Sequence, residues 1–208
     1  MKEKKIVFDL DGVLLDSEAD LDWLDRAISK ALKEIGAPVD RVNIEKLYPG
    51  ELRDFGELVQ DFPAPPEEVW RIRDKYYIAE KLRMMDEGKL KPFPDVEELY
   101  RLQNDFHLGI ISNSPGVVVD RFVEDYRLED LFRAWIGRGS ELSDLKKIKP
   151  ATHFSRVIRE EMGQGQYIYV GDRESDEEFA ENSGMEFIYL TRDGKGFDNL
   201  ADLVSYLL

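Results

Sequence analysis

Short apolar runs alternate with amphipathic stretches along much of the 208-residue chain. Five of these runs are rich in Ile, Val, Tyr and Phe and end in small or polar residues, a pattern typical of parallel strands buried on both faces. They cover residues 5–9, 108–112, 134–137, 167–171 and 187–191. Helical patterns separate the later runs, and this alternation predicts an α/β fold with a doubly wound parallel sheet.

Two of the predicted helices follow from apolar residues spaced by three and four positions. Val96, Leu99 and Tyr100 have this spacing in one stretch, and Val118 and Phe122 have it in the next. Such residues form one face of a helix, which we expect to pack against the sheet.

A long stretch between the first two predicted strands shows helical patterns and no strand pattern. It is too long for a simple crossover, so we expect an inserted helical domain. Its amphipathic runs are residues 21–35, 51–62 and 67–85, separated by Gly- and Pro-containing breakers. The predicted division is a sheet domain of residues 1–15 and 93–208 with a helical cap of residues 16–92.

Charge and cysteine content narrow the classes of function. The chain carries 44 acidic and 29 basic residues, a net charge of -15, so its overall field repels nucleic acid and anionic membranes. With no cysteine, disulfides and thiolate sites are excluded, and oxygen ligands are favoured for any metal. The apolar run near the N-terminus is too short for a signal sequence or a membrane span, so we expect a cytoplasmic enzyme.

Polar residues follow three of the predicted strands directly. They are Asp9 and Asp11, then Ser112 and Asn113, then Asp172 and Asp176. Ligands of open α/β sheets bind at the carboxyl ends of the strands, so these side chains should share one edge. Carboxylates crowded together raise one another's pKa values unless a cation neutralises them, and oxygen ligands suit a hard divalent ion. The sequence therefore predicts a Mg²⁺ site.

These segments resemble the four motifs of the haloacid dehalogenase superfamily, in the same order. The matching motifs are Asp9-Leu10-Asp11-Gly12-Val13, Ser112-Asn113, Lys149-Pro150 and the run from Gly171 to Asp176. The helical insertion resembles the family's cap in position and length. The chain departs from the common pattern at Arg173 and Glu174, where small hydroxyl residues are frequent in the family.

The resemblance implies a phosphatase that works through an aspartyl-phosphate. Asp9 would attack phosphorus, while Asp11 would protonate the leaving oxygen and then activate water. A helical cap would close over a small phosphorylated metabolite and select the leaving group. Dehalogenation is disfavoured, because the resemblance implies that dehalogenating members lack an acid at the position of Asp11.

The resemblance also assigns the remaining site residues. Mg²⁺ would bind the Asp9 side chain, the Asp11 backbone carbonyl and the Asp172 side chain. Asp176 would lie in the next layer around the metal. The phosphate would be held by Ser112, Asn113 and Lys149, and Lys149 would also neutralise charge on the nucleophile.

Other functions use similar residues and stay open at this point. A sugar-phosphate mutase would pass the phosphoryl group from Asp9 to a second hydroxyl, but the histidine frequent in such members is missing after the first motif. A receiver-like signalling domain would hold phosphate on aspartate, yet receivers lack a large helical insertion. A catalytically silent relative is disfavoured by the intact Asp9 and Asp11. We expect neither nucleic-acid nor membrane partners, and a monomer or weak homodimer.

Overall fold

The structure is a computed structural model that describes residues 4–17, 19–48, 52 and 54–208. The chain forms two compact units. The first, the sheet unit, comprises Met1–Glu18, Lys91–Arg138 and Lys147–Leu208. The second, the helical unit, comprises Ala19–Leu90 together with Gly139–Lys146. The short segment Gly139–Lys146 thus groups with the helices although it follows a strand of the sheet.

A five-stranded sheet forms the centre of the sheet unit. In sheet order its strands are β5 (Phe132–Arg138), β4 (Phe106–Pro115), β1 (Lys4–Phe8), β6 (Gln166–Gly171) and β7 (Glu186–Tyr189). Each pairs in parallel with its neighbours. Ile6, Val7 and Phe8 of β1 are fully buried, as expected for a central parallel strand covered on both faces.

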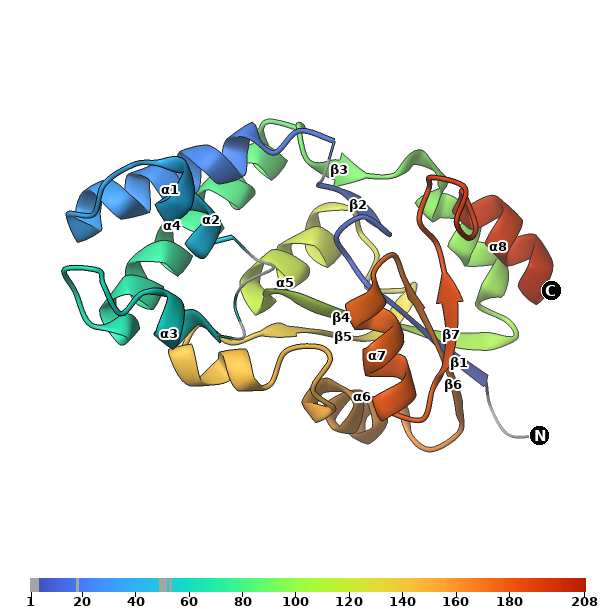
Figure 1. The fold of residues 1–208 in the computed structure, drawn as a ribbon. Coiled ribbons are helices and arrows are strands. Elements are labelled where there is room, and N and C mark those ends of the chain that lie inside the picture. Colours follow the sequence, from blue (N-terminus) through green and yellow to red (C-terminus); the bar gives the residue numbers. More distant parts are fainter. Residues whose placement is uncertain (1–3, 18, 49–51, 53) are drawn as a thin grey trace. The chain divides into compact units, whose positions relative to one another are not determined.

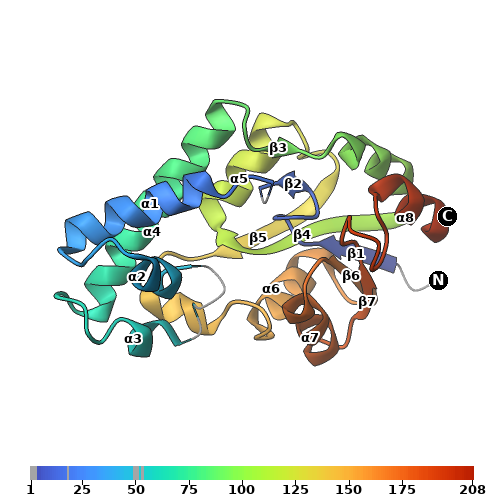
Figure 2. The ribbon, with the colours of Figure 1, turned by 45° about the horizontal axis from the view of Figure 1, so that its top comes forward.

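Helices cover both faces of this sheet, which confirms the predicted doubly wound α/β fold. They are η2 (Pro94–Leu102), α5 (Gly116–Asp125), α6 (His153–Met162), α7 (Glu174–Asn182) and α8 (Leu200–Leu207). In Figures 1 and 2, α5 lies on one face of the sheet and α6 and α7 lie on the other. A small antiparallel pair, β2 (Leu15–Asp16) with β3 (Lys91–Pro92), also belongs to this unit.

The helix expected around Val96 is a 3-10 helix, η2, rather than an α-helix. Its buried residues are Val96, Leu99 and Leu102, a spacing of three that matches three residues per turn. Tyr100, which an α-helical face would bury, is 41% exposed. The apolar pattern fits both periods over so short a stretch, so it predicted a helix without fixing its type.

The helical unit is built around two long helices, α1 (Asp22–Ile35) and α4 (Pro66–Asp86), which pack against each other. The shorter elements are α2 (Arg41–Lys46), α3 (Phe55–Leu58) and the 3-10 helix η3 (Leu142–Lys146). The Trp70 indole of α4 donates to the Ser140 carbonyl at 2.8 Å, which ties the segment before η3 to α4. Of the predicted helical run 51–62, α3 is the described α-helical part, and residues 51 and 53 lie outside the described residues.

None of the helices in the described part of the chain combines the length and the apolar character needed to cross a membrane.

Candidate active site

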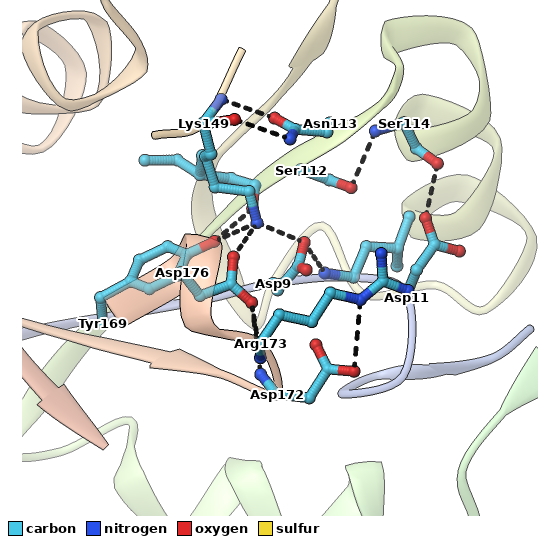
Figure 3. Close-up of polar contacts among 12 residues, drawn as sticks. Asp9, Asp11, Ser112, Asn113, Ser114, Lys149, Tyr169, Asp172, Arg173 and Asp176 are labelled. Carbon is cyan, nitrogen blue, oxygen red and sulfur yellow. Dashed lines mark hydrogen bonds and ion pairs between the residues drawn. The ribbon is translucent and has the colours of Figure 1, made fainter. Parts of the chain in front are cut away.

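The carboxyl end of the sheet brings three aspartates together. Asp9 directly follows β1, Asp172 directly follows β6, and these two strands are neighbours in the sheet. Asp176 lies in the first turn of α7, which begins after the same loop. One carboxylate oxygen from each of the three lies within 4.8 Å of the others. The three aspartates therefore form one cluster at the edge of the sheet where the sequence predicted them, as Figure 3 shows.

Lys149 supplies a positive charge inside this cluster. Its ammonium lies 2.6 Å from Asp176 Oδ1 and 3.0 Å from Asp9 Oδ1, and the side chain is almost fully buried. Burial alone would lower the pKa of Lys149, but the charges of Asp176 and Asp9 outweigh it and raise that pKa. Lys149 is therefore a fixed cation in contact with the Asp9 carboxylate.

Asp176 connects Lys149 to the start of α7. Its Oδ2 accepts the backbone N–H groups of Asp172 and Arg173, both at 3.3 Å, while Oδ1 faces the Lys149 ammonium. Acidic side chains are favourable at helix N-termini, where backbone N–H groups lack partners. Both oxygens of Asp176 are thus engaged within the protein.

The pKa values of Asp9 and Asp172 are raised. Burial raises the pKa of Asp9 to about 6, with the charges of Asp176 and Asp11 acting in the same direction and Lys149 opposing them. Burial raises the pKa of Asp172 to about 8, helped by the charges of Asp9 and Asp176. The site therefore holds more carboxyl groups than the single ammonium of Lys149 can neutralise, and their full ionisation needs further positive charge.

The donor set of this cluster fits a hard divalent cation such as Mg²⁺. Asp172 Oδ1 is buried and has no hydrogen-bond partner among the described residues. A buried carboxylate oxygen without a partner is costly, and a cation would satisfy it. All the clustered donors are oxygens, the ligands that Mg²⁺ prefers. Asp9 and Asp172 fit as ligands better than Asp176 does, because both oxygens of Asp176 are already engaged.

Gly12 allows Asp172 to approach the loop that follows β1. Its φ is +78°, in the left-handed region, and a Cβ atom at this position would lie 2.5 Å from Asp172 Oδ2. A glycine removes both the strain and the clash. The first motif therefore shapes the space around Asp172 as well as supplying Asp9.

Asp11 points to two serine hydroxyls. Ser17 Oγ donates to Asp11 Oδ1 and Ser114 Oγ donates to Asp11 Oδ2, each at 2.6 Å. The carboxylate of Asp11 is thus oriented by two serines that both follow it in the chain, one close by and one far away, and it stands outside the group of three clustered carboxylates. Figure 3 shows its side chain directed toward Ser114.

Ser112 and Asn113 lie where β4 departs from regular pairing, since its register with β5 shifts between Ile111 and Pro115. Ser112 Oγ accepts the Ser114 N–H at 3.1 Å, which leaves its own proton available to donate. Asn113 Oδ1 accepts the Lys149 N–H at 2.8 Å, and Asn113 Nδ2 donates to the Lys149 carbonyl at 3.2 Å. The Asn113 side chain therefore fixes the backbone of Lys149.

Several residues that contact the site were not singled out from the sequence. Ser17 and Ser114 hold Asp11, and Tyr169 contacts Lys149. Arg173, which the sequence marked only as a departure from the family pattern, lies 3.8 Å from Asp172 Oδ2. Neither serine belongs to a pattern that separates it from ordinary turn or strand-end residues. Tyr169 looks like one more buried strand residue, and its polar tip inside an apolar run was the available signal.

Comparisons with known proteins agree with this arrangement. A family model described as haloacid dehalogenase-like hydrolase matches residues 6–190. The phosphoglycolate phosphatase of Aliivibrio fischeri is 29% identical, with 90% of this chain and 84% of the relative covered. That of Psychrobacter arcticus is 24% identical, with 100% and 97% covered.

A solved structure extends the likeness to the fold. The crystal structure of a predicted phosphoglycolate phosphatase from Haemophilus somnus has a TM-score of 0.70 at 22% identity, with 100% of this chain and 99% of that chain covered. The family match spans most of the chain and includes every strand end that contributes to the cluster. The chain therefore belongs to the haloacid dehalogenase-like hydrolase family and is an enzyme of that class.

Proposed function

We propose that this protein hydrolyses a small phosphomonoester through an aspartyl-phosphate on Asp9, with Mg²⁺ as its cofactor. The observation that carries the proposal is the contact at 3.0 Å between the buried Asp9 carboxylate and the Lys149 ammonium. Beside this pair lies Asp172 Oδ1, which has no hydrogen-bond partner among the described residues. A site with excess negative charge and one fixed cation suits a phosphate only when a divalent cation adds positive charge.

Asp9 is suited to act as the nucleophile. Among the described residues, the hydrogen bond from Leu10 N at 2.7 Å and the ion pair with Lys149 Nζ at 3.0 Å both end on Oδ1 of its carboxylate. Oδ2 then attacks phosphorus in line, the phosphorus–oxygen ester bond breaks, and its electron pair leaves with the alcohol oxygen. Lys149 offsets negative charge on Asp9 and on the phosphoryl group during this step.

Asp11 is suited to transfer the protons. In its protonated form it gives a proton to the leaving oxygen, and as a carboxylate it then takes a proton from the water that attacks the phosphoryl group. The second attack releases inorganic phosphate and regenerates Asp9. The hydroxyls of Ser17 and Ser114 hold the Asp11 carboxyl in place between the two steps.

The phosphoryl oxygens and the metal need separate groups. Ser112 Oγ and the backbone N–H groups of Asn113 and its neighbours would donate to phosphoryl oxygens. The residues that would hold Mg²⁺ are Asp9 and Asp172 by their side chains and Asp11 by its backbone carbonyl. When bound, Mg²⁺ supplies positive charge that reduces the repulsion between the carboxylates and the phosphate.

A panel of phosphomonoesters, assayed for phosphate release with Mg²⁺ and with a chelator, tests this function. We would assay 2-phosphoglycolate first, because the curated relatives are named phosphoglycolate phosphatase. We expect turnover that the chelator abolishes and that Asp9→Asn lowers by at least about 1,000-fold. Asp130→Asn, at an exposed position in the sheet unit, serves as the matched control. Chelator-resistant turnover, or an active Asp9→Asn protein, would contradict the proposal.

A further inference from the structure

Tyr169 is a fully buried residue of β6 that reaches toward the site. Its ring packs edge-on against Phe179 of α7, with ring centroids 5.0 Å apart. Its hydroxyl donates to the Ile111 carbonyl of β4 at 2.9 Å. Since β1 lies between β4 and β6, the Tyr169 side chain extends across the strand that delivers Asp9.

The same hydroxyl accepts a hydrogen bond from the Lys149 ammonium at 2.7 Å. A phenol has one proton, and the Ile111 carbonyl, which has none, must receive it. The lone pairs of the Tyr169 oxygen are therefore available to Lys149. Burial, together with the charges of Asp9 and Asp176, raises the pKa of Tyr169 well above its usual value, so the phenol keeps this proton.

Tyr169 completes the set of acceptors around Lys149. An ammonium group has three protons. Among the described residues, its oxygen partners are Asp176 Oδ1 at 2.6 Å and Tyr169 Oη at 2.7 Å, which accept hydrogen bonds, and Asp9 Oδ1 at 3.0 Å, which forms an ion pair. Without the phenol, one proton of a buried ammonium would lack a partner, and the group would be free to shift away from Asp9.

We propose that Tyr169 is a positioning residue for the reaction, holding the Lys149 ammonium against Asp9 by means of its hydroxyl. The proposal rests on the proposed function, because Lys149 must act on Asp9 for its position to affect turnover. An alternative role for Tyr169 is packing alone, in which the ring contributes to the core and the hydroxyl is incidental. A phenylalanine at this position would then serve equally well.

Tyr169→Phe separates the two roles, since it keeps the ring and removes only the oxygen. We expect kcat to fall about 10- to 100-fold, because a small displacement of a group that stabilises the transition state has effects of that size. KM should change by less than about threefold, because the hydroxyl is fully buried and engaged by Lys149 and the Ile111 carbonyl. The matched control is Tyr167→Phe on the same strand, whose hydroxyl donates to the Gly163 carbonyl at 2.6 Å and makes no contact with Lys149. It should keep wild-type kcat.

A double-mutant cycle with Lys149→Met shows whether the effect acts through Lys149. If it does, Tyr169→Phe lowers kcat in the wild-type background and has no further effect in the Lys149→Met background. Independent, multiplying losses would overturn the proposal. So would wild-type kcat in Tyr169→Phe.

A packing variant guards against loss of activity through instability. Phe179→Leu removes the ring partner of Tyr169 and leaves its hydroxyl, so it should lower the melting temperature at least as much as Tyr169→Phe while keeping most of kcat. If Phe179→Leu loses as much kcat as Tyr169→Phe, packing explains both and the positioning role is wrong. A wild-type protein that hydrolyses no phosphomonoester would instead refute the proposed function, and the role of Tyr169 would fall with it.

Discussion

Lys149 Nζ lies closer to Asp176 Oδ1, at 2.6 Å, than to Asp9 Oδ1, at 3.0 Å. Asp176 therefore anchors the ammonium, because its other oxygen accepts backbone N–H groups at the start of α7. From this anchor the ammonium extends toward the Asp9 carboxylate. Asp176 belongs to the motif that the sequence assigned to the metal's surroundings. In the proposed mechanism, its contacts would let it act on the metal site through Asp172 and on the nucleophile through Lys149.

Asp176→Asn tests this double attachment. An asparagine has one side-chain oxygen, which can face either the backbone N–H groups of Asp172 and Arg173 or the Lys149 ammonium, but cannot serve both through separate oxygens. We expect kcat to fall about 10- to 100-fold, the usual cost of losing a group that orients a metal ligand. Glu177→Gln, the same change one residue later in α7 at a side chain that bonds to Tyr189, is the control. Equal activities of the two variants would contradict the anchoring role.

Gly12→Ala should weaken Mg²⁺ binding through Asp172. The added Cβ would lie 2.5 Å from Asp172 Oδ2, so the carboxylate must move. We expect the Mg²⁺ concentration for half-maximal activity to rise about tenfold or more. Gly88→Ala is a matched control, because Gly88 has φ +66° and a Cβ added there would meet no atom within 4 Å among the described residues. It should lose about 1 kcal/mol of stability through backbone strain and keep the wild-type Mg²⁺ dependence.

The sheet and the cluster of Asp9, Asp172 and Asp176 could be predicted because both depend on simple patterns. Buried parallel strands appear in a sequence as apolar runs, and parallel topology places the residues that follow them at one edge. Lys149 could be identified only by resemblance, because nothing in its surrounding basic run separates it from the neighbouring Lys146.

The remaining contacts depend on tertiary geometry that local patterns do not encode. Ser114 reaches Asp11 across 103 positions in sequence, and Tyr169 reaches Ile111 across 58. Gly139–Lys146 groups with the helical unit because Ser140 meets Trp70, a contact between distant segments. Hydrogen bonds of this kind leave no periodic signal, so the sequence predicted the charged groups of the site better than the neutral groups that orient them.

Glu80 should make the helical unit sensitive to acid. Its carboxylate is buried and lies 2.7 Å from Arg83, 3.0 Å from Arg26 and 3.1 Å from Lys30. The hydrogen bond from Arg83 first, then those from Arg26 and Lys30, lower the pKa of Glu80 from 4.5 to about 2 against the opposing effect of burial. Between these two values the unfolded chain binds a proton that the folded chain does not. This stabilisation is therefore present above pH 4.5 and is lost as the pH falls toward 2.

Urea unfolding of Glu80→Gln across pH checks this prediction. At pH 7 we expect the variant to be less stable by about 1.5–3 kcal/mol, the range for hydrogen bonds to charged groups. The difference from the wild-type free energy of unfolding should shrink as the pH falls below 4.5. Glu68→Gln is the control, since Glu68 is half-exposed and lies 4.0 Å from Arg71, and it should change stability by less than about 0.5 kcal/mol. If the difference in free energy of unfolding between Glu80→Gln and the wild type stays constant down to about pH 3, the lowered pKa of Glu80 is not the source of the stabilisation.

Ser114→Ala should impair proton transfer by Asp11 and leave nucleophilic attack intact. The hydroxyl of Ser114 holds Asp11 Oδ2 at 2.6 Å, and without it the acid is oriented less firmly toward the leaving oxygen. Alkyl phosphates need that proton, whereas 4-nitrophenyl phosphate has a leaving group stable enough to depart without it. We therefore expect kcat/KM to fall about tenfold or more for the alkyl ester and less than about threefold for the aryl ester, if its first step limits kcat/KM.

Asp11→Asn should show the same dependence on the leaving group in stronger form, with a burst of 4-nitrophenol followed by slow turnover, because hydrolysis of the phosphoenzyme also needs the base. Ser205→Ala, at an exposed serine of α8 bonded to the Ala201 carbonyl, is the control for both substrates. Equal losses on the alkyl and aryl esters in Ser114→Ala would mean that Ser114 supports the site as a whole. The role of Asp11 as the proton donor would then need another basis.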